Sequence, residues 1–372
     1  MSGKSLSLAI NGRFLGQPIT GVQRYAHELV FALDGLLDRR LDIDVTVISP
    51  PLHEPVPSWR NIRLRQSGKL RGHAWEQLEL PRFSAGKILF CPGNTAPVAS
   101  LLGRQPTVVC VHDLSYLYFP SAYSTGFRLL YNALMPIVLR HADAVITVSE
   151  SERKSLIERY PIVASRISVI QNGGLPASIR GNSVASTARG GYILYVGSLS
   201  KRKNFPGMFE AACRLARRRA FKFVFVGGIP KGISASGIGI PEDVRSSITF
   251  SGQVDDKDAL ASYYRGATCF LFASFFEASP LPPIEAMACG CPVIASDIPS
   301  LKERCGDAAL YCNPHSVDAI EKTVEHLVDN KELQVKLRIL GLARAADFTW
   351  EKCAHRVLDV IASVHTTKWK ML

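Results

Sequence analysis

Residues Phe270–Ser296 read FLFASFFEASPLPPIEAMACGCPVIAS, and this stretch decides the fold. The apolar run Thr268–Ala273 predicts a buried strand. A proline pair after the loop opens a short helix over Pro283–Cys289, because proline suits the first helical position. Gly290 stands where glycine commonly ends a helix, and Pro292–Ala295 predicts the next strand. This strand–helix–strand order is typical of a parallel α/β sheet.

Two carboxylates stand at the two ends of the loop between that first strand and the helix. Glu277 follows the strand, and Glu285 lies in the first turn of the helix. Open α/β sheets bind ligands at the carboxyl ends of their strands, and helix N-termini favour phosphate. A solvated loop acid and an acid that complements the helix dipole would explain the pair equally well. The functional alternative is that these planar acceptors bind vicinal hydroxyls, one on a ribose and the other on a sugar ring.

The composition indicates a globular protein with room for two domains. The chain has 372 residues, and 47% of them are hydrophobic. Leu6–Ile10 reads as a first strand rather than a secretory signal, and no apolar run approaches the roughly 18–20 residues of a membrane span. The nine cysteines are scattered without zinc-ligand spacing. We therefore expect buried, reduced thiols in a cytosolic protein.

The formal net charge of +12 and the pI of about 9.3 require an explanation. Nucleic acid, an anionic membrane surface and an anionic substrate are the three partners that such a charge suits. No nucleic-acid-binding motif is present, so we expect no nucleic acid. Arg214–Lys222 is best explained as a solvated helix end. The cluster at Arg60–Arg71 is either another solvated face or a site of attraction to anionic lipid, worth about 1 kcal/mol per basic residue.

The N-terminal half is predicted to begin with a strand, a glycine-containing loop and a helix. Ser5–Asn11 is the strand, and Thr20 with Gln23 predicts a capping box at the helix start. This arrangement suits phosphate, although it is not the glycine-rich fingerprint of a dinucleotide enzyme, which is found nowhere in the chain. Its absence weighs against a dehydrogenase.

A second strand in this half, Thr107–Val111, is entirely apolar and leads directly into His112 and Asp113. All-apolar strands are typical of buried parallel sheets. A lone histidine at a strand end is usually structural, but the carboxyl end of a parallel strand also faces the ligand side of the sheet.

The second half repeats this logic after a shift in composition at residues 176–190, which we expect to be a linker. Tyr192–Val196 is a predicted strand, and Pro206 enters a helix. Between them the loop Gly197–Asn204 carries three cations, Lys201, Arg202 and Lys203. Phosphate is the natural partner for such a group, and a solvated basic loop is the alternative.

Further elements are expected from apolar periodicity. The predicted strands are Asp44–Ile48, Lys87–Phe90, Ala144–Val148, Arg166–Ile170, Phe221–Val226 and Ile248–Ser251. The predicted helices are Phe127–Leu139, Glu152–Tyr160, Asp258–Arg265, Val317–Leu327 and a last one that starts after Thr349.

Glu277, seven residues and then Glu285, followed by AMACGCPVIA, resembles the E-x7-E signature of retaining glycosyltransferases of family 4. Further stretches resemble the same family in the same order: TGVQRY at 20–25, WEQLELP at 75–81, NTAP at 94–97, HD at 112–113 and VGSLSKRKN at 196–204. Ala278, Ser279 and Pro280 replace the usual Gly-Phe-Gly, and Ser198 stands where many relatives have arginine. The resemblance implies the GT-B fold: two doubly wound, Rossmann-like α/β domains facing a central cleft.

The resemblance also implies a role for each matching residue. In the family, basic residues in the position of Lys203 and Arg202 neutralise the leaving diphosphate, while Glu277 and His112 hold the donor sugar. These four are the candidate catalytic residues. The candidate nucleotide-sugar-binding residues are Gly21, Ser198, Gly252, Gln253, Val254, Ala278, Ser279, Leu281 and Glu285, the last on the ribose. The candidate acceptor-side residues are Asn94, Thr95 and Asp113. No metal ion and no cofactor other than the nucleotide sugar are expected.

We expect an acceptor-binding domain over residues 1–175, a nucleotide-sugar-binding domain over 191–348 and a C-terminal helix over 349–372 that crosses back to the first domain. The resemblance implies transfer of a hexose, first of all mannose from GDP-mannose, to a lipid-linked glycan or oligosaccharide. Such reactions build lipopolysaccharide and exopolysaccharide at the inner face of the cytoplasmic membrane, to which the enzyme would attach peripherally. A GDP-rhamnose, UDP-sugar or dTDP-sugar donor, a nucleotide-sugar epimerase and a catalytically silent nucleotide-sugar-binding protein stay open as alternatives.

Overall fold

A computed structural model describes residues 6–40, 42–53, 57–175, 191–228 and 239–369 of the chain. The chain divides into two compact units. Unit 1 comprises Met1–Gly173 and Trp350–Leu372, and unit 2 comprises Gly174–Thr349. The linker expected at residues 176–190 lies outside the described residues.

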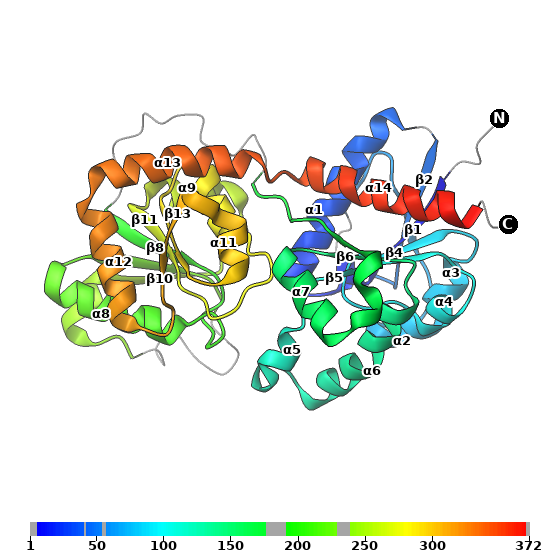
Figure 1. The fold of residues 1–372 in the computed structure, drawn as a ribbon, viewed down its shortest axis with the longest axis horizontal. Helices are drawn as coiled ribbons and strands as arrows, with labels where there is room; N and C mark the ends of the chain where they lie inside the picture. The colour runs from blue at the N-terminus through cyan, green and yellow to red at the C-terminus, as the bar shows by residue number, and fades with distance from the viewer. Residues whose placement is uncertain (1–5, 41, 54–56, 176–190, 229–238, 370–372) are drawn as a thin grey trace. The chain divides into compact units, whose positions relative to one another are not determined.

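Unit 1 is built on a parallel sheet of seven strands in the order β3-β2-β1-β4-β5-β6-β7 (Figure 1). The strands are β1 (Leu6–Asn11), β2 (Ile43–Ser49), β3 (Arg63–Gln66), β4 (Ile88–Cys91), β5 (Thr107–Val111), β6 (Ala144–Thr147) and β7 (Ile167–Val169). The chain moves outward from β1 to one edge and then from β4 to the other. The sheet therefore has its topological switch point between β1 and β4, where such sheets open a crevice for ligands.

Helices connect these strands in a doubly wound pattern. They are α1 (Gly21–Leu36), α2 (Gly72–Leu78), α3 (Leu80–Phe83), α4 (Val98–Leu102), α5 (Ser115–Tyr118), α6 (Thr125–His141), α7 (Glu150–Arg159) and the last helix, α14 (Trp350–Trp369). Although α14 follows unit 2 in the sequence, it packs on α1. The Trp350 ring lies 5.8 Å from that of Tyr25 on α1, so this last helix belongs to unit 1.

Unit 2 repeats the architecture with six parallel strands in the order β10-β9-β8-β11-β12-β13. The strands are β8 (Tyr192–Val196), β9 (Lys222–Val226), β10 (Ile248–Gly252), β11 (Cys269–Phe272), β12 (Val293–Ser296) and β13 (Ala309–Cys312). The helices are α8 (Phe205–Arg219), α9 (Lys257–Gly266), α10 (Pro282–Ala288), α11 (Pro299–Cys305), α12 (Val317–Asp329) and α13 (Lys331–Ala346). The switch point of this sheet lies between β8 and β11.

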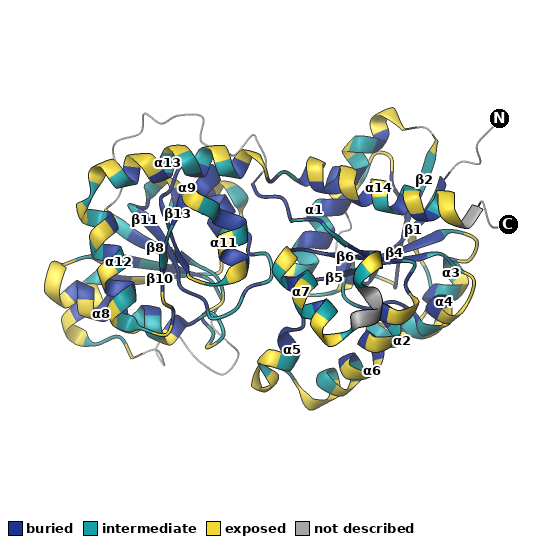
Figure 2. Ribbon diagram, in the orientation of Figure 1, coloured by how far each residue is buried: buried dark blue, intermediate teal, exposed yellow. Residues whose placement is uncertain are grey.

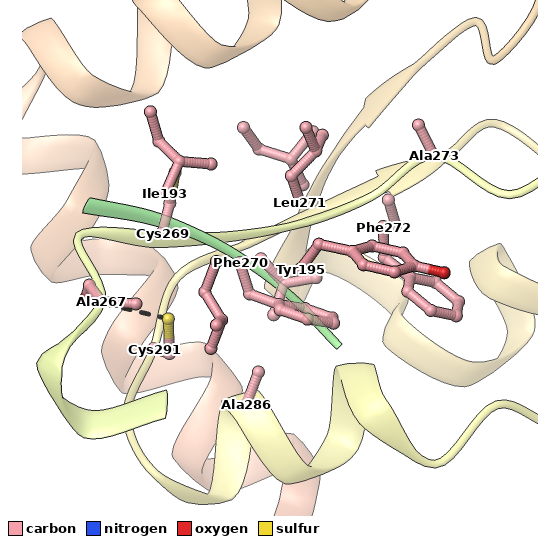
Figure 3. Packing of buried hydrophobic residues seen from close by; sticks show 14 of the residues in the cluster. Ile193, Tyr195, Ala267, Cys269, Phe270, Leu271, Phe272, Ala273, Ala286 and Cys291 are labelled. Carbon is pink, nitrogen blue, oxygen red and sulfur yellow. Dashed lines mark hydrogen bonds between the residues drawn. The ribbon is translucent and has the colours of Figure 1, made fainter. Parts of the chain in front are cut away.

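The central strands of both sheets are buried under helices whose outer faces are exposed (Figure 2). In unit 2 the apolar run of β11 fills the centre of the core. The ring of Phe272 lies 6.3 Å from that of Tyr195 on β8, and the ring of Phe270 lies 5.6 Å from that of Phe272 (Figure 3). A weak hydrogen bond from the Cys291 thiol to the Ala267 carbonyl, 3.9 Å long, joins the segments before β12 and β11. All nine cysteines of the chain are buried and none forms a disulfide.

The stretch Phe270–Ser296 folds as its residues predict. Strand β11 is buried along its whole length, α10 begins at Pro282, and Gly290 after the helix has the positive φ of 66° that glycine tolerates best. The fold class predicted from the sequence, two Rossmann-like α/β domains, is confirmed.

The capping box predicted at the start of α1 is wrong. Thr20 is the N-cap residue, but its side chain accepts no hydrogen bond from the helix backbone. Its hydroxyl instead donates to the side-chain oxygen of Gln23, whose amide donates to Gln17 at 3.0 Å. Because Gln17 lies in the preceding loop, the Gln23 side chain holds that loop instead of capping the helix.

Strand β3 and helix α13 are among the elements that have no counterpart in the sequence predictions. Strand β3 arises within the basic cluster and is an edge strand with three exposed residues. There Arg63 pairs with Asp44 at 2.5 Å, and Arg60, before the strand, pairs with Asp38 at 3.7 Å. Helix α13 packs on α10.

Candidate active site

The switch point of unit 2 brings together two residues that lie 74 positions apart in the sequence. Lys203 follows β8 and Glu277 follows β11, and these strands are neighbours in the sheet. The Lys203 ammonium donates to both carboxylate oxygens of Glu277, at 2.5 and 2.7 Å. The two side chains are 15% and 6% exposed. Water screens such a buried pair weakly, so a strong local field marks this edge of the sheet.

The loops that carry this ion pair are joined by their own backbone. Arg202 donates from its guanidinium to the carbonyl of Phe276 at 3.3 Å, and its carbonyl accepts from the backbone N–H of Phe275 at 3.2 Å. Asn204 has a left-handed backbone with φ of 54°. Its buried amide donates to the carbonyls of Ala273 and Pro314, at 2.9 and 2.7 Å. The basic loop is therefore held against the end of β11, and Arg202 lies beside Lys203 in it.

Three glycines line the same sheet edge after β8, β9 and β10. Gly227 donates its N–H to the carbonyl of Gly252 at 2.8 Å, and Gly197 donates to Val226 at 2.9 Å. Gly227 has φ of 151°, and a Cβ built there would lie 1.9 Å from the carbonyl oxygen of Gly197. Only glycine allows the backbones to approach so closely. Ser198 thus comes next to the turn that follows β9.

Two of the predicted nucleotide-sugar-binding residues, Gln253 and Val254, follow β10 directly. Gln253 is exposed and donates to Asp255 at 2.7 Å, while Val254 is partly buried against the core. The oxygen of the Gln253 side chain lies 3.2 Å from a Cβ built on Gly228, in the turn after β9. The loops after β8, β10 and β11 of unit 2 thus carry predicted site residues.

Glu285 is completely buried in the first turn of α10. The hydroxyl of Tyr264 on α9 donates to its carboxylate at 3.1 Å. Ala278, Ser279 and Leu281 form the loop between Glu277 and α10, and Leu281 is buried. The guanidinium of Arg304, itself 1% exposed, donates to the carbonyl of Pro280 at 3.3 Å and so fixes this loop.

The charge of Glu277 also affects Tyr195, whose hydroxyl donates to the carbonyl of Ser198 at 2.9 Å. Burial raises the pKa of this phenol, and the negative charge of Glu277 raises it further, against the opposing effect of Arg202. The hydroxyl therefore stays protonated and keeps the turn after β8 in place.

In unit 1, His112 is buried directly after β5. Its Nε2 lies 2.8 Å from the carbonyl of Pro92 and must donate there, because a carbonyl only accepts. Burial lowers the pKa of His112, while the bond to Pro92 and the nearby Asp113 oppose this effect. The imidazole is thus neutral at pH 7, with Nδ1 as its acceptor nitrogen.

The candidate acceptor-side residues gather around the loop after β4. The side-chain oxygen of Asn94, whose φ is 54°, accepts from the backbone N–H of His112 at 2.7 Å. Thr95 is buried, and Asp113 accepts from the hydroxyl of Ser115 at 2.6 Å. Asn94 and Asp113 line a pocket of about 470 Å³ at the carboxyl edge of the sheet. Gly21, at the start of α1, has nothing within 4 Å of a Cβ built on it.

The structure adds a buried network that the sequence analysis missed, centred on Glu76 of α2. Glu76 is fully buried and accepts from Asn11 at 2.6 Å, from Thr95 at 2.8 Å and from Arg13 at 3.2 Å. Nδ1 of His73 is a fourth donor at 3.0 Å. Burial alone would raise the pKa of Glu76, but the charge of Arg13 and these hydrogen bonds outweigh it and hold the pKa below its ordinary value. Arg13, two residues beyond β1, was the available signal, because it follows a strand on the ligand edge.

Within the described residues, no three or more His, Cys, Asp or Glu side chains are grouped so as to hold a metal ion. None of the described helices is both long enough and apolar enough to cross a bilayer. Lys203 and Arg202 carry positive charge at the candidate site of unit 2.

Comparison with known proteins identifies the class. Residues 19–173 match the family model described as Glycosyltransferase Family 4, and residues 183–341 match the model described as Glycosyl transferases group 1. Together the two matches span most of the chain. The chain belongs to this family of glycosyltransferases, as the E-x7-E resemblance predicts.

Its curated relatives include two O-antigen enzymes. The O-antigen chain mannosyltransferase B of Escherichia coli is 29% identical over 68% of this chain and 70% of its own length. The O-antigen chain mannosyltransferase RfbU of Salmonella typhimurium is 25% identical over 87% of this chain and 92% of its own. The serotype-specific mannosyltransferase WbdA of E. coli is a longer protein. It is 28% identical over 68% of this chain, and the match covers 33% of its own length.

Solved structures share the fold across nearly the whole chain. Sucrose-phosphate synthase of Thermosynechococcus elongatus gives a TM-score of 0.75 at 18% identity and covers 97% of this chain and 100% of its own. Anabaena HepE, crystallised with UDP and glucose, gives 0.71 at 17% identity over 96% and 100%. At these identities the likeness concerns the fold, which is GT-B.

Proposed function

We propose that this glycosyltransferase transfers a hexose, mannose from GDP-mannose, with retention of configuration to a lipid-linked glycan or oligosaccharide in the synthesis of a cell-surface polysaccharide. The observation that carries the proposal is the Lys203–Glu277 pair at the switch point of unit 2, held among three glycine turns. The mannosyltransferase names of the relatives support the choice of sugar.

Unit 2 binds the nucleotide sugar in this proposal. When the bond between the anomeric carbon and the diphosphate breaks, negative charge grows on the diphosphate oxygens. Lys203 and Arg202 stabilise this charge from positions fixed before the reaction, which is the most effective form of electrostatic catalysis. Because both oxygens of Glu277 now bind Lys203, an arriving diphosphate competes for the ammonium and releases carboxylate oxygens that accept from sugar hydroxyls.

The remaining assignments follow the family resemblance and suit the local chemistry. Glu285, buried at a helix start, accepts from the ribose hydroxyls, and the backbone of the turns at Ser198 and Gly252 approaches the nucleotide. Neutral His112 accepts a hydrogen bond from a sugar hydroxyl at Nδ1, because its Nε2 already donates to the carbonyl of Pro92. The acceptor is bound by unit 1. The two cations supply the charge that a metal ion would otherwise provide, so EDTA leaves the rate unchanged.

A lipid-linked acceptor places the enzyme at the inner face of the cytoplasmic membrane as a peripheral protein. The net charge of +12 supports attraction to anionic lipid. Co-sedimentation with vesicles is the test. The protein pellets with phosphatidylglycerol vesicles at low salt and stays in the supernatant with phosphatidylcholine vesicles; equal behaviour with both would remove this assignment.

The donor is tested with a panel of GDP-mannose, GDP-rhamnose, UDP-glucose and a dTDP-sugar, each with a lipid-linked glycan acceptor. A gain of one hexose mass with GDP-mannose, and an α-linkage by NMR, are the expected results. Another active donor would overturn the choice of mannose, and a β-linkage from the α-linked donor would overturn retention. Appearance of an epimer when acceptor is omitted would favour the epimerase alternative instead.

A further inference from the structure

The pocket of unit 1 lies at the switch point between β1 and β4. Its volume of about 470 Å³ falls in the range of small-molecule sites. Besides the candidate residues Asn94 and Asp113, two further kinds of surface line its wall. One is the end of the polar network around Glu76, and the other is a row of aromatic rings from helix α6 and the turn before it.

The polar side of the pocket carries fixed hydrogen-bonding groups but little net charge. Arg13 and His73 line it, and both contact the buried carboxylate of Glu76. His73 donates from Nδ1 to Glu76, and its Nε2 lies 3.4 Å from the guanidinium of Arg13. The charges of Arg13 and Glu76 cancel within the network. The parts of the Arg13 and His73 side chains that face the pocket are therefore oriented hydrogen-bonding groups whose charge is compensated, and such groups bind hydroxyls.

The aromatic side is a stack of three rings. The Tyr123 and Phe127 rings are stacked at 5.1 Å, and the Phe127 and Tyr131 rings at 3.9 Å. Tyr123 and Phe127 are half-buried. An aromatic face carries partial negative charge and attracts the slightly positive C–H groups of a pyranose ring. Burial raises the pKa of Tyr131 to about 12, so its hydroxyl remains a donor at neutral pH.

The pocket is a poor host for an anion. Its one arginine is already matched by Glu76, and Asp113 on its wall adds a carboxylate. A phosphate would meet an uncompensated acid there, whereas unit 2 offers the adjacent cations Lys203 and Arg202. The two switch points therefore select ligands of different charge.

We propose that this pocket is the subsite for a neutral pyranose of the acceptor, stacked on the ring of Tyr123 that Phe127 supports from behind and hydrogen-bonded to Arg13 and His73. The inference rests on the proposed function, because it assigns the acceptor of that reaction as a glycan recognised by its uncharged terminal sugar. The lipid and its phosphates lie outside this subsite.

Binding to the full chain tests the proposal, with methyl α-mannopyranoside, methyl α-glucopyranoside and inorganic phosphate as probes in saturation-transfer NMR. At least one pyranoside shows ring-proton contact in the wild type. Phe127→Ala weakens its binding about tenfold, because the Tyr123 ring loses the ring that it stacks on and is no longer held in place. The matched control is Leu129→Ala on the same helix, because Leu129 is 66% exposed and is not part of the pocket wall. Tyr123→Phe keeps the ring and retains binding, whereas Tyr123→Ala loses it.

GDP binding by calorimetry, in the same variants, separates this inference from the proposed function. Unchanged GDP affinity with weakened pyranoside binding supports the subsite. GDP binding without any pyranoside binding, or pyranoside binding that Phe127→Ala and Tyr123→Ala leave intact, overturns it while the donor site stands. Pyranoside binding without any nucleotide binding would overturn the donor assignment and leave the subsite. Phosphate that competes for the Phe127 site would also contradict the neutral assignment.

Discussion

The two units share one topology and place different chemistry at the same point of it. Each has a parallel sheet whose strand order reverses beside its first strand, at β1/β4 in unit 1 and β8/β11 in unit 2. In unit 1 the acid Glu76 is buried below the pocket wall and neutralises Arg13. In unit 2 the acid Glu277 meets Lys203 at the sheet edge itself, among glycine turns. The fold thus provides the location, and the residues just beyond the strands decide which ligand charge it accepts.

The largest expected effect concerns the ion pair of unit 2. Lys203→Met removes the charge that stabilises the departing diphosphate, so kcat for transfer falls about 100- to 1000-fold. The measurement is the steady-state rate with the donor identified by the panel. Arg217→Ala is the matched control, because Arg217 also pairs with a carboxylate in unit 2 but is 47% exposed. A Lys203→Met enzyme that is folded and fully active would remove Lys203 from the mechanism.

The buried network of unit 1 predicts the next effect. Glu76→Ala leaves Arg13 buried without its carboxylate and lowers the free energy of unfolding by about 3 kcal/mol. Asp243→Ala, which breaks the exposed pair with Arg217, has a much smaller effect on the free energy of unfolding, because water and salt screen an exposed pair. Both values come from denaturant titration. Equal effects would show that Glu76 does not organise the pocket of unit 1.

One glycine from each unit gives a third contrast. Gly227→Ala brings a methyl group against the carbonyl oxygen of Gly197 and destabilises unit 2 by about 2–4 kcal/mol. Gly21→Ala meets open space in the first turn of α1 and stabilises unit 1 slightly or leaves it unchanged. Thermal unfolding measures both. If Gly21→Ala raises the KM for the donor without loss of stability, the predicted role of Gly21 in nucleotide-sugar binding is supported; an unchanged KM would remove it.

The smallest effect is a pH dependence. The pKa of Glu76 is lower in the folded chain than the ordinary value of about 4.3, so the unfolded state binds the proton more readily. Its stabilising contribution is complete above that ordinary value and is lost as the pH falls through the folded pKa. The difference in unfolding free energy between wild type and Glu76→Gln is therefore largest near pH 7 and shrinks below about pH 4. A difference that grows on acidification would reverse the assigned sign.

The sequence predicts elements whose residues carry a local signal, and fails where the signal is tertiary. The apolar run of β11 and the proline and glycine around α10 are such local signals. Strand β3 is not predicted, because its arginines are exposed on a sheet edge and its sequence shows no apolar alternation. The Thr20–Gln23 capping box has the right pattern, but Gln23 finds a partner in Gln17 instead.

The same limit applies to the candidate site. Lys203 and Glu277 are each predictable as ligand-edge residues, whereas their direct contact depends on β8 and β11 being neighbours. The Glu76 network joins residues from β1, α2 and the loop after β4. No spacing of these residues in the sequence predicts that they meet. Such sets become visible only when the sheet order is known.

Hydrogen exchange on addition of GDP tests the difference between the two switch points most directly. The account predicts slower amide exchange at residues 197–204 and 275–285 of unit 2, and unchanged exchange in the α6 peptide 123–131 of unit 1. Calorimetry on the same sample establishes that GDP is bound. Bound GDP that protects the 123–131 peptide and leaves both unit 2 segments unchanged would contradict the account.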